Sequence, residues 1–106
     1  MARTLVNVPK TARRGEVLEI RAMIAHPMET GYRQDAQGRP RPRHIIRRFV
    51  CTYDGAEVFA ADFHPAMSAN PFIAFTTVAT RSGALTFSWT DDKGVTETAT
   101  AEIAVA

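Results

Sequence analysis

Residues 16–25 read Glu-Val-Leu-Glu-Ile-Arg-Ala-Met-Ile-Ala, and this stretch decides the fold class. Apolar residues occupy every second position of it: Leu18, Ile20, Ala22 and Ile24. Glu19 and Arg21 lie between them and point to the other face. An apolar period of two with one polar face is typical of a half-buried β-strand, not of a helix.

The same kind of pattern recurs along the chain and predicts strands throughout. Besides residues 16–25, six further segments qualify: 4–8, 44–53, 56–63, 72–80, 84–90 and 95–105. Seven short strands without a convincing helix are typical of an all-β fold. We therefore predict a single domain over residues 1–106, an immunoglobulin- or fibronectin III-like antiparallel β-sandwich of about seven strands.

Turn and aromatic residues refine this prediction. Asp54-Gly55 is a strong signal for a two-residue hairpin, which keeps its two flanking strands in one sheet. Much of the core is expected from four large aromatic side chains: Phe72, Phe75, Phe87 and Trp89. Because strands alternate in direction, the loops at residues 26–43, 64–71 and 91–94 should lie at one end of the sandwich, and binding residues concentrate on such loops.

Composition places the chain among ordinary globular domains. Its 106 residues are 45% hydrophobic and 23% charged, which argues against disorder. No apolar run approaches the ~18 residues that span a bilayer, and the first residues lack the apolar stretch of a signal peptide. These features predict a soluble cytoplasmic protein without a membrane partner, or a mature chain exported by another route. The single cysteine rules out an intrachain disulfide.

Charge is distributed unevenly. Residues 1–53 hold eleven basic and four acidic groups, a net +7, whereas residues 54–106 hold two basic and seven acidic groups, a net −5. The total of +2 is too small to favour nucleic acid as a partner. Arginines cluster at residues 39–48, where they form either a solvated loop or a docking strip for an acidic partner or an anionic substrate.

No pattern in the sequence identifies a catalytic site, a cofactor site or a metal site. The three histidines, His26, His44 and His64, match no metal-binding spacing, and a metal site would need them to converge with a carboxylate such as Glu29 or Asp62. We interpret them as surface or capping residues. The sequence also has no nucleophile elbow, phosphate-binding glycine loop or zincin motif. A binding or scaffold domain is therefore favoured over an enzyme.

Two further features have simple interpretations. Cys51 lies within a strand on the face of Phe49 and Tyr53, and is predicted to be a small buried hydrophobic residue. A reactive thiol, with Arg47 on the same face, and an interchain disulfide are the alternatives. Residues 91–94, Asp-Asp-Lys-Gly, are predicted to form a hairpin turn.

Four separated blocks resemble the SoxZ family, subunits of the SoxYZ carrier complex of thiosulfate oxidation. The blocks are Ile24-Ala25-His26-Pro27-Met28-Glu29-Thr30-Gly31, Arg43-His44-Ile45-Ile46-Arg47-Arg48-Phe49, Pro65-Ala66-Met67-Ser68-Ala69-Asn70-Pro71-Phe72 and Trp89-Thr90-Asp91-Asp92-Lys93-Gly94. They follow the family's order and extend over nearly the whole chain. The family fold is an immunoglobulin-like sandwich, in agreement with the strand pattern.

The resemblance implies a non-catalytic role beside a second protein, SoxY. In that family SoxY carries sulfur intermediates on a cysteine in a glycine-rich C-terminal tail, and passes them among the Sox enzymes of the periplasm. The present chain ends in a strand, so Cys51 is not expected to be the carrier. The resemblance also implies export together with a SoxY that has a twin-arginine signal. The expected partner-binding residues are His26, Met28, Glu29, Arg41, Arg43, Met67, Asn70 and Phe72.

Two questions stay open at this stage. SoxY can attach through a free strand edge or through apolar residues on an outer sheet face, such as Met23 or Val78. The alternative function is that of a free-standing immunoglobulin-like domain, which binds a small ligand or serves in adhesion. If the chain is instead a SoxY partner, other Sox enzymes are expected to dock to it only transiently.

Overall fold

The computed structural model describes residues 4–64 and 67–106, and these residues form strands but no helix. Pro65 and Ala66, which belong to the third block above, lie outside the described residues. The eight strands are β1 (Thr4–Asn7), β2 (Thr11–Ala12), β3 (Val17–Ile24), β4 (Ile46–Tyr53), β5 (Ala56–Asp62), β6 (Phe72–Val78), β7 (Gly83–Asp91) and β8 (Thr96–Val105). All seven predicted strands are present, and the two-residue strand β2 is additional. No described segment forms a helix long enough to cross a membrane.

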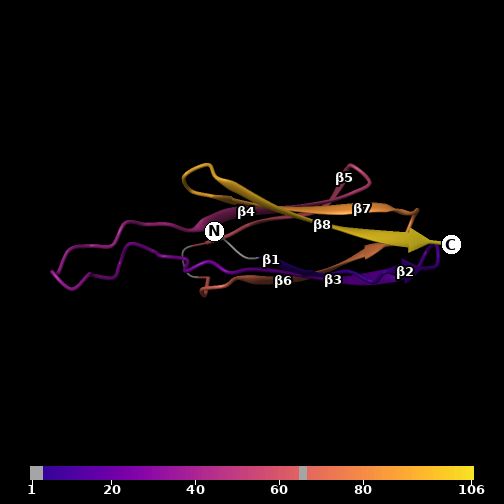
Figure 1. Ribbon diagram of the computed structural model, residues 1–106. Helices are drawn as coiled ribbons and strands as arrows, with labels where there is room; N and C mark the ends of the chain where they lie inside the picture. Colours follow the sequence, from indigo (N-terminus) through magenta and orange to yellow (C-terminus); the bar gives the residue numbers. More distant parts are fainter. Residues whose placement is uncertain (1–3, 65–66) are drawn as a thin grey trace.

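Two sheets pack face to face, as Figure 1 shows, which confirms the predicted sandwich. The smaller sheet has the order β1-β3-β6, and the larger has the order β2-β8-β7-β4-β5. Every pairing is antiparallel except that of β2 with β8. The hairpin at Asp54-Gly55 joins β4 to β5 as predicted, with φ angles of 50° and 85°. Positive φ at both central residues is what a tight type I′ hairpin requires.

Aromatic side chains fill the space between the sheets. Phe49 is fully buried, and its ring centroid lies 5.3 Å from that of Trp89, 6.2 Å from that of Phe87 and 6.1 Å from that of Phe75. The alternating residues of β3 that define the pattern in the sequence are buried against this cluster: Leu18, Ile20, Ala22 and Ile24. The period of two therefore identified the core face correctly.

Phe72 is the exception among the predicted core aromatics, because 54% of it is exposed. Strand β6 directs Phe75 inward, and Phe72, an odd number of positions away, points to the outer face. There it pairs in register with Met23, which in turn pairs with Leu5. Leu5, Met23 and Phe72 thus form a row across the outer face of the three-stranded sheet, which we call the outer row.

Arg47 also differs from the prediction. The pairing of β4 with β7 shifts register between Ile46 and Arg48, and both Arg47 and Arg48 are exposed. A bulge of this kind adds one residue to a strand and reverses the facing of the positions before it. Arg47 therefore does not share the buried face of Cys51.

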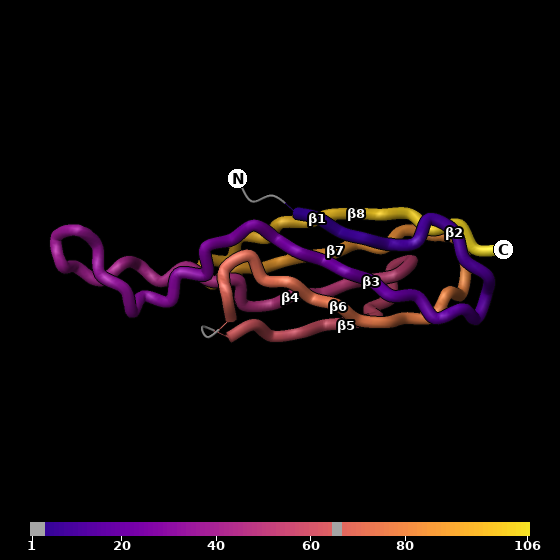
Figure 2. The backbone as a smooth tube through the Cα atoms, turned by 90° about the horizontal axis from the view of Figure 1, so that it is seen from below, coloured from indigo at the N-terminus to yellow at the C-terminus, as the bar shows by residue number. Residues whose placement is uncertain are grey.

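Residues 26–43 form a narrow projection, which we call the arm, that extends well beyond the sandwich (Figures 1 and 2). Its two segments are joined near the base by paired backbone hydrogen bonds between Glu29 and His44, of 2.8 and 2.7 Å. Farther out, the Arg41 N–H donates to the Arg33 carbonyl at 2.9 Å. The arm gives the molecule its length of 59 Å against 20 Å in the other two directions.

The loops predicted to share one end of the sandwich do meet there. The Asn70 N–H donates to the His26 carbonyl at 2.7 Å, and the Asn70 side-chain oxygen accepts the His26 N–H at 3.0 Å. The Asp92 N–H donates to the Ile45 carbonyl at 3.0 Å. The base of the arm is therefore bonded to both neighbouring loops.

The different burial of two phenylalanines predicts a large difference in stability. Replacing buried Phe87 with alanine should lower the free energy of unfolding by about 3–5 kcal/mol, because it leaves a cavity in the core. Phe72→Ala should cost less than about 1 kcal/mol, since the side chain is largely in solvent. Urea unfolding followed by tryptophan fluorescence measures both, and equal losses would contradict the assigned facing of β6.

Candidate functional site

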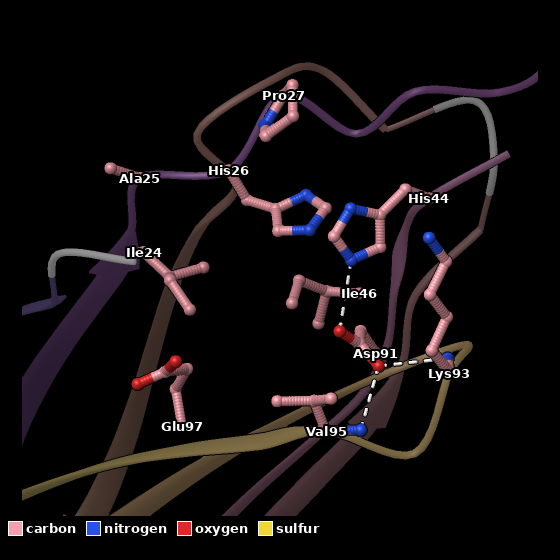
Figure 3. A pocket seen from close by; sticks show the side chains of 10 residues that line it. All are labelled: Ile24, Ala25, His26, Pro27, His44, Ile46, Asp91, Lys93, Val95 and Glu97. Carbon is pink, nitrogen blue, oxygen red and sulfur yellow. Dashed lines mark hydrogen bonds and ion pairs between the residues drawn. The ribbon is translucent and has the colours of Figure 1, made fainter. Parts of the chain in front are cut away.

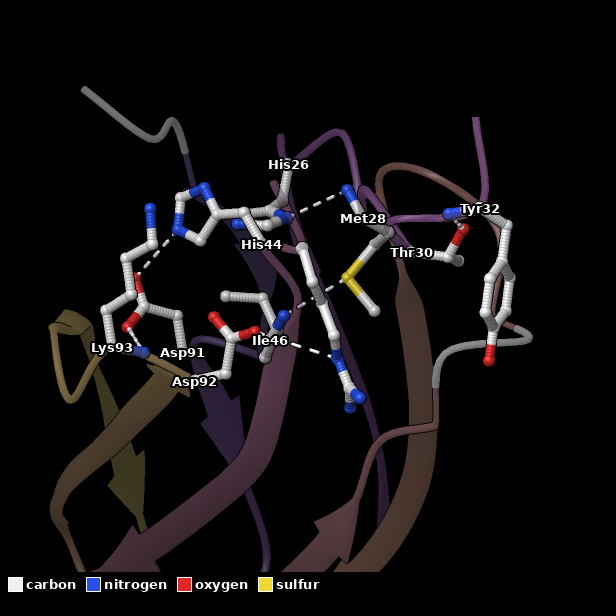
Figure 4. A network of polar contacts seen from close by, with 10 residues as sticks. His26, Met28, Thr30, Tyr32, His44, Ile46, Asp91, Asp92 and Lys93 are labelled. Carbon is white, nitrogen blue, oxygen red and sulfur yellow. Dashed lines mark hydrogen bonds and ion pairs between the residues drawn. The ribbon is translucent and has the colours of Figure 1, made fainter. Parts of the chain in front are cut away.

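A polar cluster lies at the base of the arm. It consists of His26, His44, Asp91 and Asp92, which are brought together by the two ends of the β3–β4 connection and by the β7–β8 turn (Figures 3 and 4). His26 follows the end of β3, His44 precedes β4, Asp91 ends β7 and Asp92 begins the turn to β8. Residues distant in sequence thus meet at the end of the sandwich where the loops gather.

Asp91 is the most firmly held member of the cluster. One carboxylate oxygen accepts backbone N–H groups from Lys93 and Val95, each at 2.9 Å. The other oxygen lies 3.0 Å from Nε2 of His44. Burial alone would raise the pKa of Asp91, but the hydrogen bonds from His44, Val95 and Lys93 together lower it below its usual value. Asp91 is therefore an ionised carboxylate at neutral pH.

His26 is buried, with 7% of its surface exposed, and its ring packs edge-on against His44 with centroids 4.6 Å apart. Its Nδ1 accepts the Met28 N–H at 2.9 Å. Burial first, and His44 second, lower the pKa of His26, so that the ring is neutral at neutral pH. A neutral imidazole that accepts at Nδ1 carries its hydrogen on Nε2. That Nε2 is buried and has no hydrogen-bond partner among the described residues.

A pocket of about 420 Å³ opens beside the two histidines (Figure 3). Its apolar wall includes Ile24, Ile46 and Val95. The polar residues that line it are His26, His44, Asp91, Lys93 and Glu97. An apolar wall with a few convergent polar groups is the usual form of a small-ligand site.

The histidines therefore converge in part: His26 meets His44, whereas His64, which begins the other long loop predicted to share this end, does not join them. His44 meets Asp91 and Asp92, and His26 packs against His44, whereas the carboxylates considered from the sequence, Glu29 and Asp62, are engaged elsewhere. Glu29 binds Arg33 in the arm, and Asp62 binds Arg48, at 2.7 and 2.8 Å respectively. His64 is exposed and does not belong to the cluster.

Several of the predicted partner-binding residues are interior. His26 and Met28 are buried, and the Met28 sulfur lies 3.3 Å from the Ile46 N–H. The Glu29 side chain is only 12% exposed and binds Arg33, whose hydrogen bond is the main reason that the pKa of Glu29 is lowered. Asn70 is exposed, although it exchanges two hydrogen bonds with the backbone of His26. These residues shape the base of the arm, and a direct contact with a partner stays a prediction for them.

The other predicted residues are more accessible. Arg41 and Arg43 project from the arm with about half of each side chain exposed, at 3.9 Å from Glu29 and 3.8 Å from Asp92 respectively. Met67 is partly buried and packs against the core, while Phe72 belongs to the outer row. The accessible members therefore lie on two surfaces, the arm and the outer face of the small sheet.

Asp91 and Asp92 were not predicted as site residues, because an Asp-Asp-Lys-Gly sequence is explained fully by a turn. Only their approach to His44 at the base of the arm gives them a second role. The one signal available in the sequence was the prediction that these loops share an end of the sandwich.

Cys51 is fully buried between the sheets, as predicted. Burial raises the pKa of its thiol to about 12, so that almost none of it is thiolate at neutral pH. Because the thiolate is the reactive form, the Cys51 thiol is unreactive toward thiol reagents and oxidants in the folded chain.

The burial of Cys51 predicts that the native chain resists thiol reagents. Ellman's reagent at pH 8 should label the folded protein at least about a hundredfold more slowly than the chain in guanidinium, where the pKa returns to its ordinary value. A Cys51→Ala, Thr98→Cys variant, with an exposed thiol on β8, is the positive control. Rapid labelling of Cys51 in the native chain would contradict its burial.

Comparison with known proteins places the chain in a family. The model of the family "Sulphur oxidation protein SoxZ" matches residues 6–102. No curated protein matches the chain. Among solved structures, a superoxide reductase (neelaredoxin) from Ignicoccus hospitalis is 20% identical with a TM-score of 0.70, covering 97% of this chain and 80% of its own. The sulfur carrier protein SoxY from Chlorobium limicola f thiosulfatophilum is 14% identical with a TM-score of 0.69, covering 97% and 78%.

At these identities the two solved structures show a shared sandwich fold and nothing more. The family match extends over nearly the whole chain and agrees with the four sequence blocks and with the all-β architecture. This chain belongs to the SoxZ family of sulfur oxidation proteins.

Proposed function

We propose that the chain is a non-catalytic subunit that binds SoxY to form a periplasmic carrier complex for thiosulfate oxidation. SoxY supplies the cysteine that holds the sulfur intermediates, and this chain stabilises SoxY and offers surface to the other Sox enzymes. The observation that carries the proposal is the exposed outer row, on a chain that belongs to the SoxZ family.

The outer row is suited to a stable protein partner. Leu5 and Phe72 are 64% and 54% exposed, and Met23 lies between them in register. Contiguous exposed apolar groups on a small domain mark an interaction surface. Val17 and Val78 pair with each other farther along the same sheet and are also exposed. Of the two modes of attachment considered from the sequence, these contacts favour packing on the sheet face.

The buried thiol supports the division of labour between the two proteins. A carrier cysteine must reach the active sites of several enzymes, whereas Cys51 is buried between the two sheets and its thiol has a pKa of about 12. The sulfur intermediates therefore belong on the partner's cysteine. Export together with SoxY into the periplasm is part of the same proposal, since the Sox enzymes that use the carrier work there.

The arm provides a second surface, for transient partners. Four arginines project along its length: Arg33, Arg39, Arg41 and Arg43. Glu29 offsets part of this charge near the base, and Tyr32 is 85% exposed. Excess positive charge on an extended element speeds the approach of acidic partners without requiring a large interface. We therefore assign the docking of other Sox enzymes to the arm.

A ligand-binding module is the second candidate, favoured by the pocket beside His26 and His44. It differs from the first in needing no second chain. The oligomeric state in the presence of SoxY separates the two.

Mixing the chain with SoxY should give a one-to-one or higher complex on size-exclusion chromatography with light scattering. Phe72→Asp should weaken the complex at least about tenfold, because it buries a charge in the outer row. Ala104→Asp, at an exposed apolar residue on β8 of the five-stranded sheet, is the matched control and should bind normally. A chain that stays monomeric with SoxY would reject the proposal, and equal effects of the two variants would reject the outer row as the interface.

Charge reversal in the arm should slow the docking of another Sox enzyme to the complex. Arg41→Glu with Arg43→Glu should lower the association rate more at low than at high ionic strength, because salt screens exposed charges over about 8–10 Å. Stopped-flow fluorescence at two salt concentrations measures this. Arg13→Glu with Arg14→Glu changes the net charge equally at exposed residues outside the arm, and should have a smaller effect. Equal slowing by both pairs would reject steering by the arm.

A further inference from the structure

We propose that His44, Asp91 and Asp92 bind one divalent transition-metal ion, with His26 beside it as a hydrogen-bond donor. Each of the first three residues offers one ligand atom, and these atoms all lie within 4.8 Å of one another (Figure 4). The set contains one imidazole and two carboxylates. This donor chemistry suits Zn²⁺ or Co²⁺ with one coordination position left for solvent or a ligand.

The ligand atoms need to move only a short distance to coordinate one ion. Ligands about 2.0–2.1 Å from a tetrahedral ion are roughly 3.4 Å apart. Nε2 of His44 and the Asp91 carboxylate are already 3.0 Å apart. The His44 side chain is 37% exposed and is free to adjust, and placing its hydrogen on Nδ1 presents the Nε2 lone pair to the ion.

Asp91 is preorganised for this role. The two backbone N–H groups of Lys93 and Val95 fix one of its oxygens, so that the other is directed at His44. Hydrogen bonds of this kind to a ligating carboxylate orient it and are a regular part of protein metal sites. The turn at residues 91–94 thus holds a ligand as well as reversing the chain.

Two buried polar atoms next to the cluster independently indicate a missing partner. Oδ1 of Asp92 is a buried acceptor with no hydrogen bond among the described residues. Nε2 of His26, in a side chain that is 93% buried, is a donor without a partner among the same residues, and its ring faces His44 across the edge of the pocket (Figure 3). Unpaired buried polar atoms are costly. An ion at Asp92 with a solvent ligand facing His26 would satisfy both.

The local charges favour a cation over an anion. Asp91, Asp92 and Glu97 bring three carboxylates to this end of the molecule. Arg43 and Lys93 oppose them, but Nε of Arg43 is 3.8 Å from Asp92 and half of its side chain is in solvent. A long, exposed ion pair contributes little, so a divalent ion at the carboxylates displaces it at small cost.

Titration of the purified chain with Co²⁺ and Zn²⁺ tests the site directly, using a preparation without a histidine tag. Calorimetry should give one ion per chain, and Co²⁺ should show visible absorption bands of a low-coordinate site that Zn²⁺ removes. Asp92→Asn, which keeps the side-chain shape, should weaken binding at least about tenfold, and His44→Ala should abolish it. Because SoxY takes no part, the result is independent of the proposed function.

His64→Ala is the matched control, since His64 is an exposed histidine outside the cluster. Binding that survives His64→Ala and is lost in the two cluster variants supports the proposal. No saturable binding up to about 1 mM Co²⁺, or equal binding by the wild-type chain and Asp92→Asn, would overturn it. Thermal denaturation with and without Zn²⁺ gives a second readout, in which only chains with an intact cluster should gain stability.

Discussion

The carboxylate of Asp91 links the elements at the end of the sandwich from which the arm projects. It accepts two backbone N–H groups of its own turn and bonds His44, the residue at which the arm returns to β4. His44 in turn pairs through its backbone with Glu29 on the outgoing segment. The turn, both segments of the arm and the pocket are therefore fixed relative to one another by a short chain of hydrogen bonds.

The alternation of apolar residues in β3 predicted its core face, because a strand with period two buries one side. The recurrence of strand patterns in six further segments, without a helix, predicted the sandwich. The same reasoning failed at Phe72, where a large aromatic residue faces solvent and only the register with Met23 reveals why. Strand β2 has two residues and depends on pairing with β8, so that no local pattern marks it.

The polar cluster lay beyond sequence reasoning for a different reason. His26 and His44 lie at the two ends of the β3–β4 connection, and the two aspartates lie at the β7–β8 turn. Each of these residues has an ordinary local explanation as a cap or a turn. Their significance depends on distances between loops, which neither spacing nor composition determines. The expectation that these loops share an end of the sandwich was confirmed. The strand pattern could not predict which side chains of the loops meet there.

The arm is built almost independently of the sandwich. Its backbone hydrogen bonds run between its own two segments, and its junction with the body is confined to a few residues near His26 and His44. Changes in its length or charge therefore leave the aromatic core untouched. If the arm docks other Sox enzymes as proposed, substitutions in it can change which enzymes bind, and how fast, without lowering the stability of the sandwich.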